Sequence, residues 1–155
     1  MGKEIERKFI VRRERFNPAE ADSACAMVQA YISTDRDATV RVRVINGLEA
    51  RLTVKGRNNG AVRNEWEYPI PVADALDMLE SLPVKARIDK TRYRFGRWEV
   101  DCFAGRLQGL IVAEIELQQP DEQFSAPDFI GREVTDDPRY YNSSLGSAEE
   151  LPPFS

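Results

Sequence analysis

The chain has 155 residues, which is enough for one domain with a single core, and its 22 basic and 26 acidic side chains leave a net charge of −4. This small net charge does not favour bulk attraction to nucleic acid or to an anionic membrane. The absence of histidine excludes Ser-His-Asp catalysis and His-ligated zinc, and the two cysteines make no disulfide framework.

No apolar stretch of the sequence is long enough to span a bilayer, and the charged run that starts at Lys3 does not resemble a signal peptide. We therefore expect a cytoplasmic location, with neither a membrane nor a nucleic acid as partner. The oligomeric state is left open, and a homodimer is one arrangement that the sequence allows.

Alternation of apolar and charged residues predicts strands over much of the chain. The expected strands cover residues 3–12, 27–34, 38–46, 49–57, 61–70, 84–95, 97–104 and 110–118. Asn46-Gly47 predicts a tight hairpin turn, and Asn58-Asn59-Gly60 predicts the next one. Most neighbouring strands are therefore expected to run antiparallel.

Helices are expected to be few and short. Asn17-Pro18 is typical of a helix start, with the asparagine as cap and the proline in the first turn. A second helix is expected between Pro71 and Pro83. The tail is predicted to be loop-rich up to Asp137-Pro138, where a last short helix begins that ends at Gly146.

The first expected strand carries the run Glu4-Ile5-Glu6-Arg7-Lys8. In a strand, residues two apart share a face, so Glu4, Glu6 and Lys8 line up. Two carboxylates followed by an ammonium suit a hard cation that itself holds a phosphate. A half-buried strand with a solvated charged face explains the same pattern, so this strand alone does not decide the question.

The same division into an apolar face and a charged face recurs along the chain. The residues on the charged faces are Arg41, Arg43, Thr53, Lys55, Arg63, Glu65, Glu67, Glu99, Asp101, Glu114 and Glu116. The exposed face of an ordinary sheet mixes charges with Ser, Thr and Gln. Here it is nearly all acidic and basic, which indicates a specialised charged surface.

About eight antiparallel strands with hairpin turns indicate a mainly β fold, either a barrel or a strongly curved sheet with a few short flanking helices. An eight-stranded barrel has room inside for side chains or one small ligand. If the charged faces point outward, the apolar faces form an ordinary core. If they point inward, the barrel must also hold water, metal and anion, because burying unpaired ions is prohibitive. The residues themselves do not choose between these arrangements.

Several short motifs together resemble the CYTH family, also called triphosphate tunnel metalloenzymes. The motifs are Glu4-Ile-Glu-Arg-Lys-Phe9, Gln29-Ala-Tyr31, Val40-Arg-Val-Arg43, Leu52-Thr-Val-Lys55, Glu65-Trp-Glu67, Lys90-Thr-Arg-Tyr93, Trp98-Glu-Val-Asp101, Ala113-Glu-Ile-Glu116 and Glu133-Val-Thr135. They run in the family's order over nearly the whole chain. The resemblance implies one domain over residues 1–155, an eight-stranded antiparallel tunnel with an inward charged face, and hydrolysis of triphosphates with Mg²⁺ or Mn²⁺.

The resemblance also implies roles for individual residues. A metal would be held by Glu4, Glu6 and Glu116, with Glu114 and Asp101 in support or at a second metal. Phosphate oxygens would be bound by Lys8, Arg41, Arg43, Lys55, Arg63, Lys90 and Arg92. The arginines among them offer bidentate contacts. Supporting acids of the lumen would be Glu65 and Glu67.

One expected strand presents its basic residues on two faces. Lys85 and Arg87 share one face, whereas Lys90 and Arg92 share the other. Either a bulge lies between the pairs or only one pair reaches the lumen. The family pattern favours Lys90 and Arg92, and Arg87 stays an additional candidate for phosphate binding.

The proton acceptor of the reaction is open because the chain has no histidine. The attacking water must be activated by the metal, by a carboxylate or by a lysine of lowered pKa. Lys90 is the candidate base, since a neighbouring cation such as Arg92 disfavours its charged form. Lys8 is the other expected catalytic residue.

The expected reaction is hydrolysis of inorganic tripolyphosphate, with nucleoside triphosphates as further substrates. Three alternatives remain open: an adenylate cyclase, a thiamine triphosphatase and a non-catalytic polyphosphate-binding module. The family's cyclases tend to carry a His-Phe pair that this chain lacks. Trp66 and Trp98 are expected to face outward and so give a thiamine ring no platform. An anion sensor needs no metal carboxylates, so Glu4, Glu6 and Glu116 argue against that reading.

Overall fold

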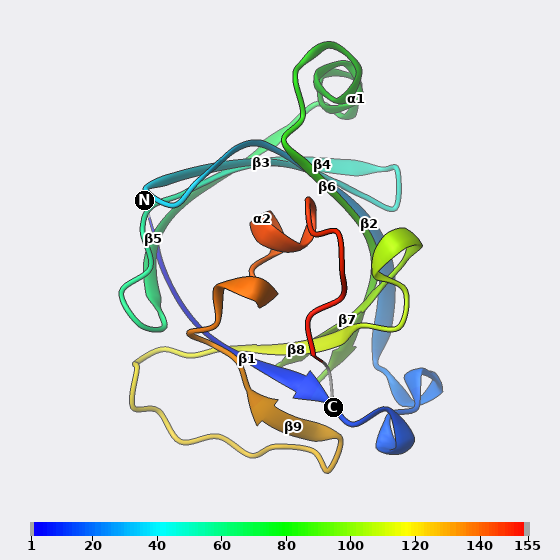
Figure 1. Cartoon of the computed structure of the whole chain (residues 1–155), viewed down its shortest axis with the longest axis vertical. Helices are drawn as coiled ribbons and strands as arrows, with labels where there is room; N and C mark the ends of the chain where they lie inside the picture. The colour runs from blue at the N-terminus through cyan, green and yellow to red at the C-terminus, as the bar shows by residue number, and fades with distance from the viewer. Residues whose placement is uncertain (1, 154–155) are drawn as a thin grey trace.

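The computed structural model describes residues 2–153, and Figure 1 shows their strands as a closed ring seen along the barrel axis. The strands are β1 (Gly2–Val11), β2 (Ser23–Asp35), β3 (Ala38–Ile45), β4 (Glu49–Lys55), β5 (Val62–Ile70), β6 (Ala86–Phe95), β7 (Trp98–Phe103), β8 (Ile111–Glu116) and β9 (Ile130–Glu133). The α-helices are α1 (Val72–Ser81) and α2 (Asn142–Leu145), and short 3-10 helices span Arg13–Arg15, Pro18–Glu20, Gly105–Leu107 and Pro138–Tyr140.

The described strands form one sheet in the order β5-β4-β3-β2-β6-β7-β8-β1-β9, and β1 also pairs with β5. That last pairing, which sets Glu4 opposite Arg63, closes eight strands into a barrel. The expected eight-stranded antiparallel barrel is therefore confirmed. The short strand β9 beside the end of β1 was expected to be loop, because four residues give too little alternation to predict a strand.

Local signals in the sequence account for several turns and caps. Asn46 and Gly47 both have positive φ, at 52° and 67°, as a type I′ hairpin turn requires. The side chain of Asn17 accepts a hydrogen bond from the backbone of Ala19 at 3.0 Å. Only a 3-10 turn follows it, because the chain enters β2 a few residues later.

The apolar faces of the strands point out of the barrel and are covered there by other segments. Helix α1 packs Ala75 against Val42 and Val44. On another side, Trp98 lies edge-to-face with Phe9 and Phe124, at ring separations of 5.5 and 5.7 Å. Because the apolar face is used outside, the charged face points inward, which answers the question that the residues alone left open.

The C-terminal segment closes one end of the barrel from within. Figure 1 shows α2 inside the ring of strands. Tyr140 and Leu145 are fully buried there, in a cluster with Ile88, Leu110 and Tyr31. The lumen is therefore apolar and filled at this end, and charged along the rest of its length.

Gly146 provides a test of this packing. A Cβ atom at this position would lie 2.6 Å from Cβ of Ala86 and 2.9 Å from the backbone nitrogen of Arg87. We expect Gly146→Ala to lower the free energy of unfolding by about 1–3 kcal/mol, measured by urea denaturation, because overpacking displaces the segment. Gly56→Ala is the control, since its nearest atom would lie at 3.8 Å. Equal stability of both variants would contradict this account of the packing.

Candidate functional site

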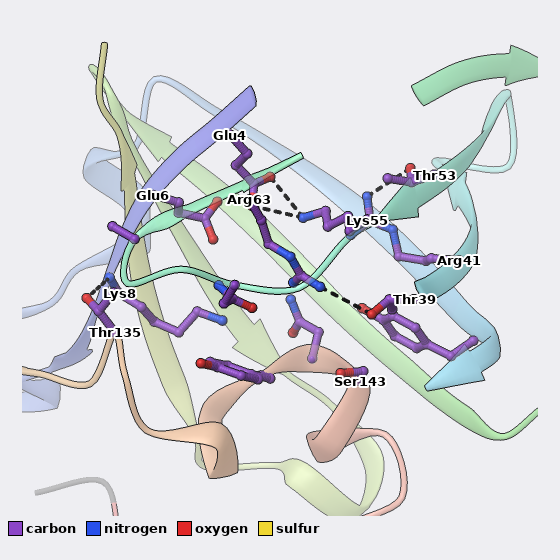
Figure 2. A pocket seen from close by; sticks show the side chains of 15 residues that line it. Glu4, Glu6, Lys8, Thr39, Arg41, Thr53, Lys55, Arg63, Thr135 and Ser143 are labelled. Carbon is purple, nitrogen blue, oxygen red and sulfur yellow. Dashed lines mark hydrogen bonds and ion pairs between the residues drawn. The ribbon is translucent and has the colours of Figure 1, made fainter. Parts of the chain in front are cut away.

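The lumen contains two adjoining polar cavities. One has a volume of about 190 Å³ and is lined by Glu4, Glu6, Arg41, Arg43, Lys55, Glu65, Glu67, Arg92, Glu99, Glu114, Glu116 and Asn142. The other, shown in Figure 2, shares several of these residues and adds Lys8, Tyr31, Thr39, Thr53, Arg63, Tyr141 and Ser143. Most of the residues expected at the site are therefore brought together, from β1, β3, β4, β5, β6 and β8.

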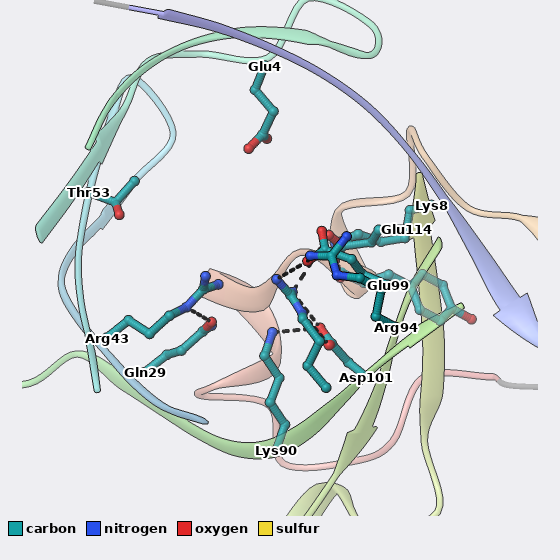
Figure 3. Close-up of polar contacts among 12 residues, drawn as sticks. Glu4, Lys8, Gln29, Arg43, Thr53, Lys90, Arg94, Glu99, Asp101 and Glu114 are labelled. Carbon is teal, nitrogen blue, oxygen red and sulfur yellow. Dashed lines mark hydrogen bonds and ion pairs between the residues drawn. The ribbon is translucent and has the colours of Figure 1, made fainter. Parts of the chain in front are cut away.

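Lys90, Arg92 and Asp101 form a buried cluster in the wall of the lumen, and Figure 3 shows Lys90 pointing toward Asp101. The Lys90 ammonium donates to Asp101 Oδ2 at 2.6 Å, and Arg92 donates to both oxygens of the same carboxylate at 2.8 and 3.0 Å. Burial lowers the pKa of Lys90 to about 7, and the charges of Arg92 and Arg43 contribute although Asp101 opposes them. Lys90 is therefore poised between its neutral and charged forms near neutral pH.

Asp101 makes contacts that its expected supporting role at a metal did not include. Three donors from Lys90 and Arg92 occupy its two oxygens, and it is 1% exposed. Burial alone would raise the pKa of Asp101, but the two cations lower it to about 2. In this structure the carboxylate therefore acts as a counter-ion that positions Lys90 and Arg92, and its supporting role at a metal stays a prediction.

Arg87 also differs from expectation. It lies on the outer face of β6, where its guanidinium is 57% exposed and pairs with Asp89 at 3.3 Å. Strand β6 keeps its alternation without a bulge in its pairing with β2, so Arg87 and Lys90 fall on opposite faces. Arg87 is therefore no phosphate ligand, and Lys90 and Arg92 are the pair that faces inward.

Two lysines of the lumen are held by acidic partners. The Lys55 ammonium lies 2.8 Å from Glu4 and 3.5 Å from Glu65. The Lys8 ammonium lies 3.5 Å from Glu114 and donates to the backbone carbonyl of Tyr140 at 3.0 Å. Burial opposes the charged form of Lys8, but the charges of Glu114, Glu6 and Asp101, with Tyr31, together outweigh it and raise the pKa. These ion pairs link both lysines to the carboxylates of β1, β5 and β8.

Three carboxyl groups of the lumen have raised pKa values. Burial, with the charges of Glu114 and Glu4, raises the pKa of Glu6 well above its ordinary value. Burial, with a hydrogen bond to Glu4, raises the pKa of Glu65 to about 7. Glu116, opposite Glu6 across β1 and β8, has its pKa raised by burial and by Glu4. Such a group of oxygen donors fits a hard divalent cation, whose positive charge would offset the repulsion between these carboxyl groups.

The donors are not already gathered around one point. Within residues 2–153, no set of three carboxylates lies close enough to hold a metal ion. Glu4 is engaged by Lys55, and Glu114 by Lys8. Glu6 and Glu116 have no cationic partner within 4.0 Å in the described chain. A metal held here therefore requires Glu4 and its neighbours to rearrange.

The crowding predicts how stability responds to metal and pH. A carboxyl whose pKa in the folded protein exceeds the ordinary value of 4.5 stabilises the fold most at pH values below 4.5. This contribution is lost as pH rises through the pKa of the folded protein, which is about 7 for Glu65. We expect metal-free protein to lose stability between about pH 5 and pH 8, and Mg²⁺ or Mn²⁺ to restore it mainly at the upper end. Urea denaturation with metal or with a chelator measures this. If metal increased the free energy of unfolding equally at about pH 5 and about pH 8, this expectation would be contradicted.

Several lumen residues were not expected at the site. Thr53 accepts a hydrogen bond from Arg41 at 3.2 Å and donates to Glu67 at 2.8 Å, and its alternation with Lys55 gave a usable signal. Gln29 bonds Arg43, and no pattern of charge marked it. Tyr141 and Ser143 reach the cavity from the C-terminal segment, and no periodicity in the sequence places that segment inside a barrel.

None of the helices in the described chain is long and apolar enough to cross a membrane.

Comparisons with known proteins agree with this geometry. The family model described as "CYTH domain" matches residues 2–147. An inorganic triphosphatase of Acetivibrio thermocellus is 49% identical over 149 residues, covering 94% of each chain. An inorganic triphosphatase of Nitrosomonas europaea is 36% identical over 151 residues, covering 92% of this chain and 95% of the other.

A solved structure gives the same result in three dimensions. The crystal structure of the inorganic triphosphatase NE1496 superposes with a TM-score of 0.64 and 31% identity, covering 94% of this chain and 99% of that one. Its likeness extends over the whole barrel, since the match leaves little of either chain out. With its closed eight-stranded barrel, its inward charges and a family match over almost its full length, this chain belongs to the CYTH family.

Proposed function

We propose that this protein is a metal-dependent triphosphatase that hydrolyses inorganic tripolyphosphate inside the lumen. The observation that carries the proposal is a set of buried cations on the inner face of the barrel, four of which line the two adjoining cavities together with carboxylates, while Lys90 lies behind them in the wall. The buried cations are Lys8, Arg41, Arg43, Lys90 and Arg92. Both curated relatives named above are inorganic triphosphatases. Triphosphatases of this family generally depend on a metal, and the all-oxygen donor set favours Mg²⁺ or Mn²⁺ here.

The cations perform most of the work of phosphoryl transfer, which depends on positioning and on offsetting charge. Arg41 and Arg43 come from β3 and Arg92 from β6, two strands separated by β2, so they can contact a triphosphate from two parts of the wall. Lys8 and Lys55 stand next to carboxylates, where they can bind the oxygens of an anion that arrives with its metal.

Glu4, Glu6 and Glu116 are the residues that would hold the metal, with Glu114 in support. When bound, the metal supplies positive charge to the phosphate oxygens and acidifies water. Glu65 and Glu67 flank this group, and Glu67 is tied to Arg41 at 3.5 Å. The side chains of this region therefore divide the lumen into a carboxylate-rich wall and a cation-rich wall.

Lys90 is the proposed proton acceptor. Its pKa of about 7 leaves a useful fraction neutral at physiological pH. The hydrogen bond to Asp101 fixes the position of its nitrogen. A bound triphosphate would favour the charged form and raise this pKa, so the fraction of neutral Lys90 that can accept a proton would grow as pH rises above neutral.

A phosphate-release assay tests the proposal. Tripolyphosphate, ATP, thiamine triphosphate and pyrophosphate are compared, each with Mg²⁺, with Mn²⁺ and with a chelator. We expect metal-dependent release to be fastest from tripolyphosphate. Arg41→Ala should lose this activity, whereas Arg87→Ala, on the outer face, should keep it. A lack of release from every triphosphate would contradict the proposal, and faster release from thiamine triphosphate would reassign the substrate.

A further inference from the structure

Gln29 lies in the middle of β2 with its side chain fully buried in the wall of the lumen. Its Cα partners are Arg43 on β3 and Ile88 on β6. Its Oε1 accepts a hydrogen bond from Nε of Arg43 at 2.6 Å, as Figure 3 shows. Its Nε2 has no hydrogen-bond partner within the described chain. A buried amide nitrogen without a partner is uncommon and indicates a missing acceptor.

Arg43 differs from most other cations of the lumen, although Arg63 also lacks a carboxylate partner in the described chain and instead donates to the Gly56 carbonyl and the Thr39 hydroxyl. Lys8, Arg41, Lys55, Lys90 and Arg92 each lie within 4.0 Å of a carboxylate. Among residues 2–153, no carboxylate comes within that distance of Arg43, and the amide of Gln29 is the one partner of its side chain. Its charge is therefore not cancelled by the protein.

An uncancelled guanidinium is costly at this position. Burial, followed by the charges of Arg41 and Arg92, lowers the pKa of Arg43 to about 9. The terminal nitrogens of Arg43 make no hydrogen bond within the described chain, and the residue lines the 190 Å³ cavity. An anion bound in the cavity would supply the countercharge that the protein does not give to Arg43.

We propose that Gln29 is a positioning residue for the substrate: its amide oxygen fixes the guanidinium of Arg43, and its amide nitrogen, which is enclosed and lines neither cavity in the empty protein, turns to donate to the same phosphoryl group when the anion binds. The inference deepens the proposed function and rests on it for the identity of the anion. A neutral amide suits this task because it orients Arg43 without cancelling its charge. A carboxylate would give the same orientation and remove the attraction for phosphate.

This difference gives Gln29→Glu two effects of opposite sign. The carboxylate would pair with Arg43, so the melting temperature of the empty protein should stay equal or rise. It would also repel the anion and lose the amide donor, so the dissociation constant for tripolyphosphate should rise at least about tenfold. If Gln29 served only the fold, its substitution would lower the affinity for tripolyphosphate and the melting temperature together.

The test measures the melting temperature and, by calorimetry, tripolyphosphate binding, with a chelator present so that no metal contributes. Wild type, Gln29→Glu, Gln29→Met and the exposed control Gln108→Glu are compared. We expect affinity to fall in the order wild type, Gln29→Met, Gln29→Glu, with Gln108→Glu like wild type. Gln29→Met, which removes both amide contacts without adding charge, carries the test if Gln29→Glu does not fold.

Two results would overturn the inference in different ways. Wild-type protein that binds tripolyphosphate while Gln29→Glu and Gln29→Met bind it equally well would reject the role of Gln29 alone. Wild-type protein that neither binds nor hydrolyses tripolyphosphate would reject the proposed function together with it.

Discussion

Glu6→Gln is expected to lower the turnover of tripolyphosphate at least about 100-fold, because loss of one ligand oxygen misplaces the metal and the phosphates that it bridges. The same change should raise the melting temperature of the metal-free protein. Glu6 lies among Glu4 and Glu114, whose charges, after burial, raise its pKa well above the ordinary value. The amide removes that repulsion, so activity and stability should change in opposite directions.

Phosphate release and thermal denaturation measure the two effects on the same preparation. Glu80→Gln, at an exposed position on α1, is the matched control and should change neither. If Glu6→Gln keeps near wild-type turnover, the carboxylate wall has been assigned to the wrong residues. If it loses turnover and stability together, the crowding of Glu6 with Glu114 has been misjudged.

Lys90→Arg should lower kcat about 100- to 10,000-fold if Lys90 accepts the proton. Arginine keeps the positive charge and can still pair with Asp101, but it does not act as a base near neutral pH. The pKa of Lys90 is about 7 in the empty protein and rises with a bound anion. The wild-type rate should therefore increase with pH from about neutral upward, and the variant should lack that increase.

The pH dependence of kcat separates the two roles of Lys90. A lysine that only binds phosphate should, as arginine, show a higher KM with much of kcat retained and with an unchanged pH profile. Lys85→Arg, at an exposed position just before β6, is the control. Retention of kcat and of the profile in Lys90→Arg would leave the activation of water to the carboxylate wall and its metal.

The sequence predicted the strands well because their alternation is regular. In β3, valines alternate with Arg41 and Arg43, and in β6 buried residues alternate with more exposed ones over most of the strand. Asn46-Gly47 predicts a hairpin turn that the structure contains. The direction of the charged face was harder. Alternation is the same whether Arg41 points inward or outward, and the answer depends on α1 and the segment with Phe124 and Phe129 covering the outer apolar face.

Other features depend on contacts between distant segments. The position of Asp101 in its alternating strand is equally compatible with a metal ligand and with a counter-ion. Its contacts with Lys90 and Arg92 on β6 identify it as a counter-ion in this structure. The C-terminal segment enters the barrel because Tyr140 and Leu145 find an apolar end there, which no local pattern shows. Gln29 is a single neutral residue in a β-strand, and its importance follows from the uncancelled charge of Arg43.

The most direct measurement is a crystal structure with tripolyphosphate and Mn²⁺, in which the anomalous signal of manganese locates the metal. Our account predicts manganese beside Glu4, Glu6 and Glu116, with the anion reaching across the lumen to Arg41 and Arg43. Manganese and tripolyphosphate bound only on the outer surface of the barrel, with an empty lumen, would contradict it.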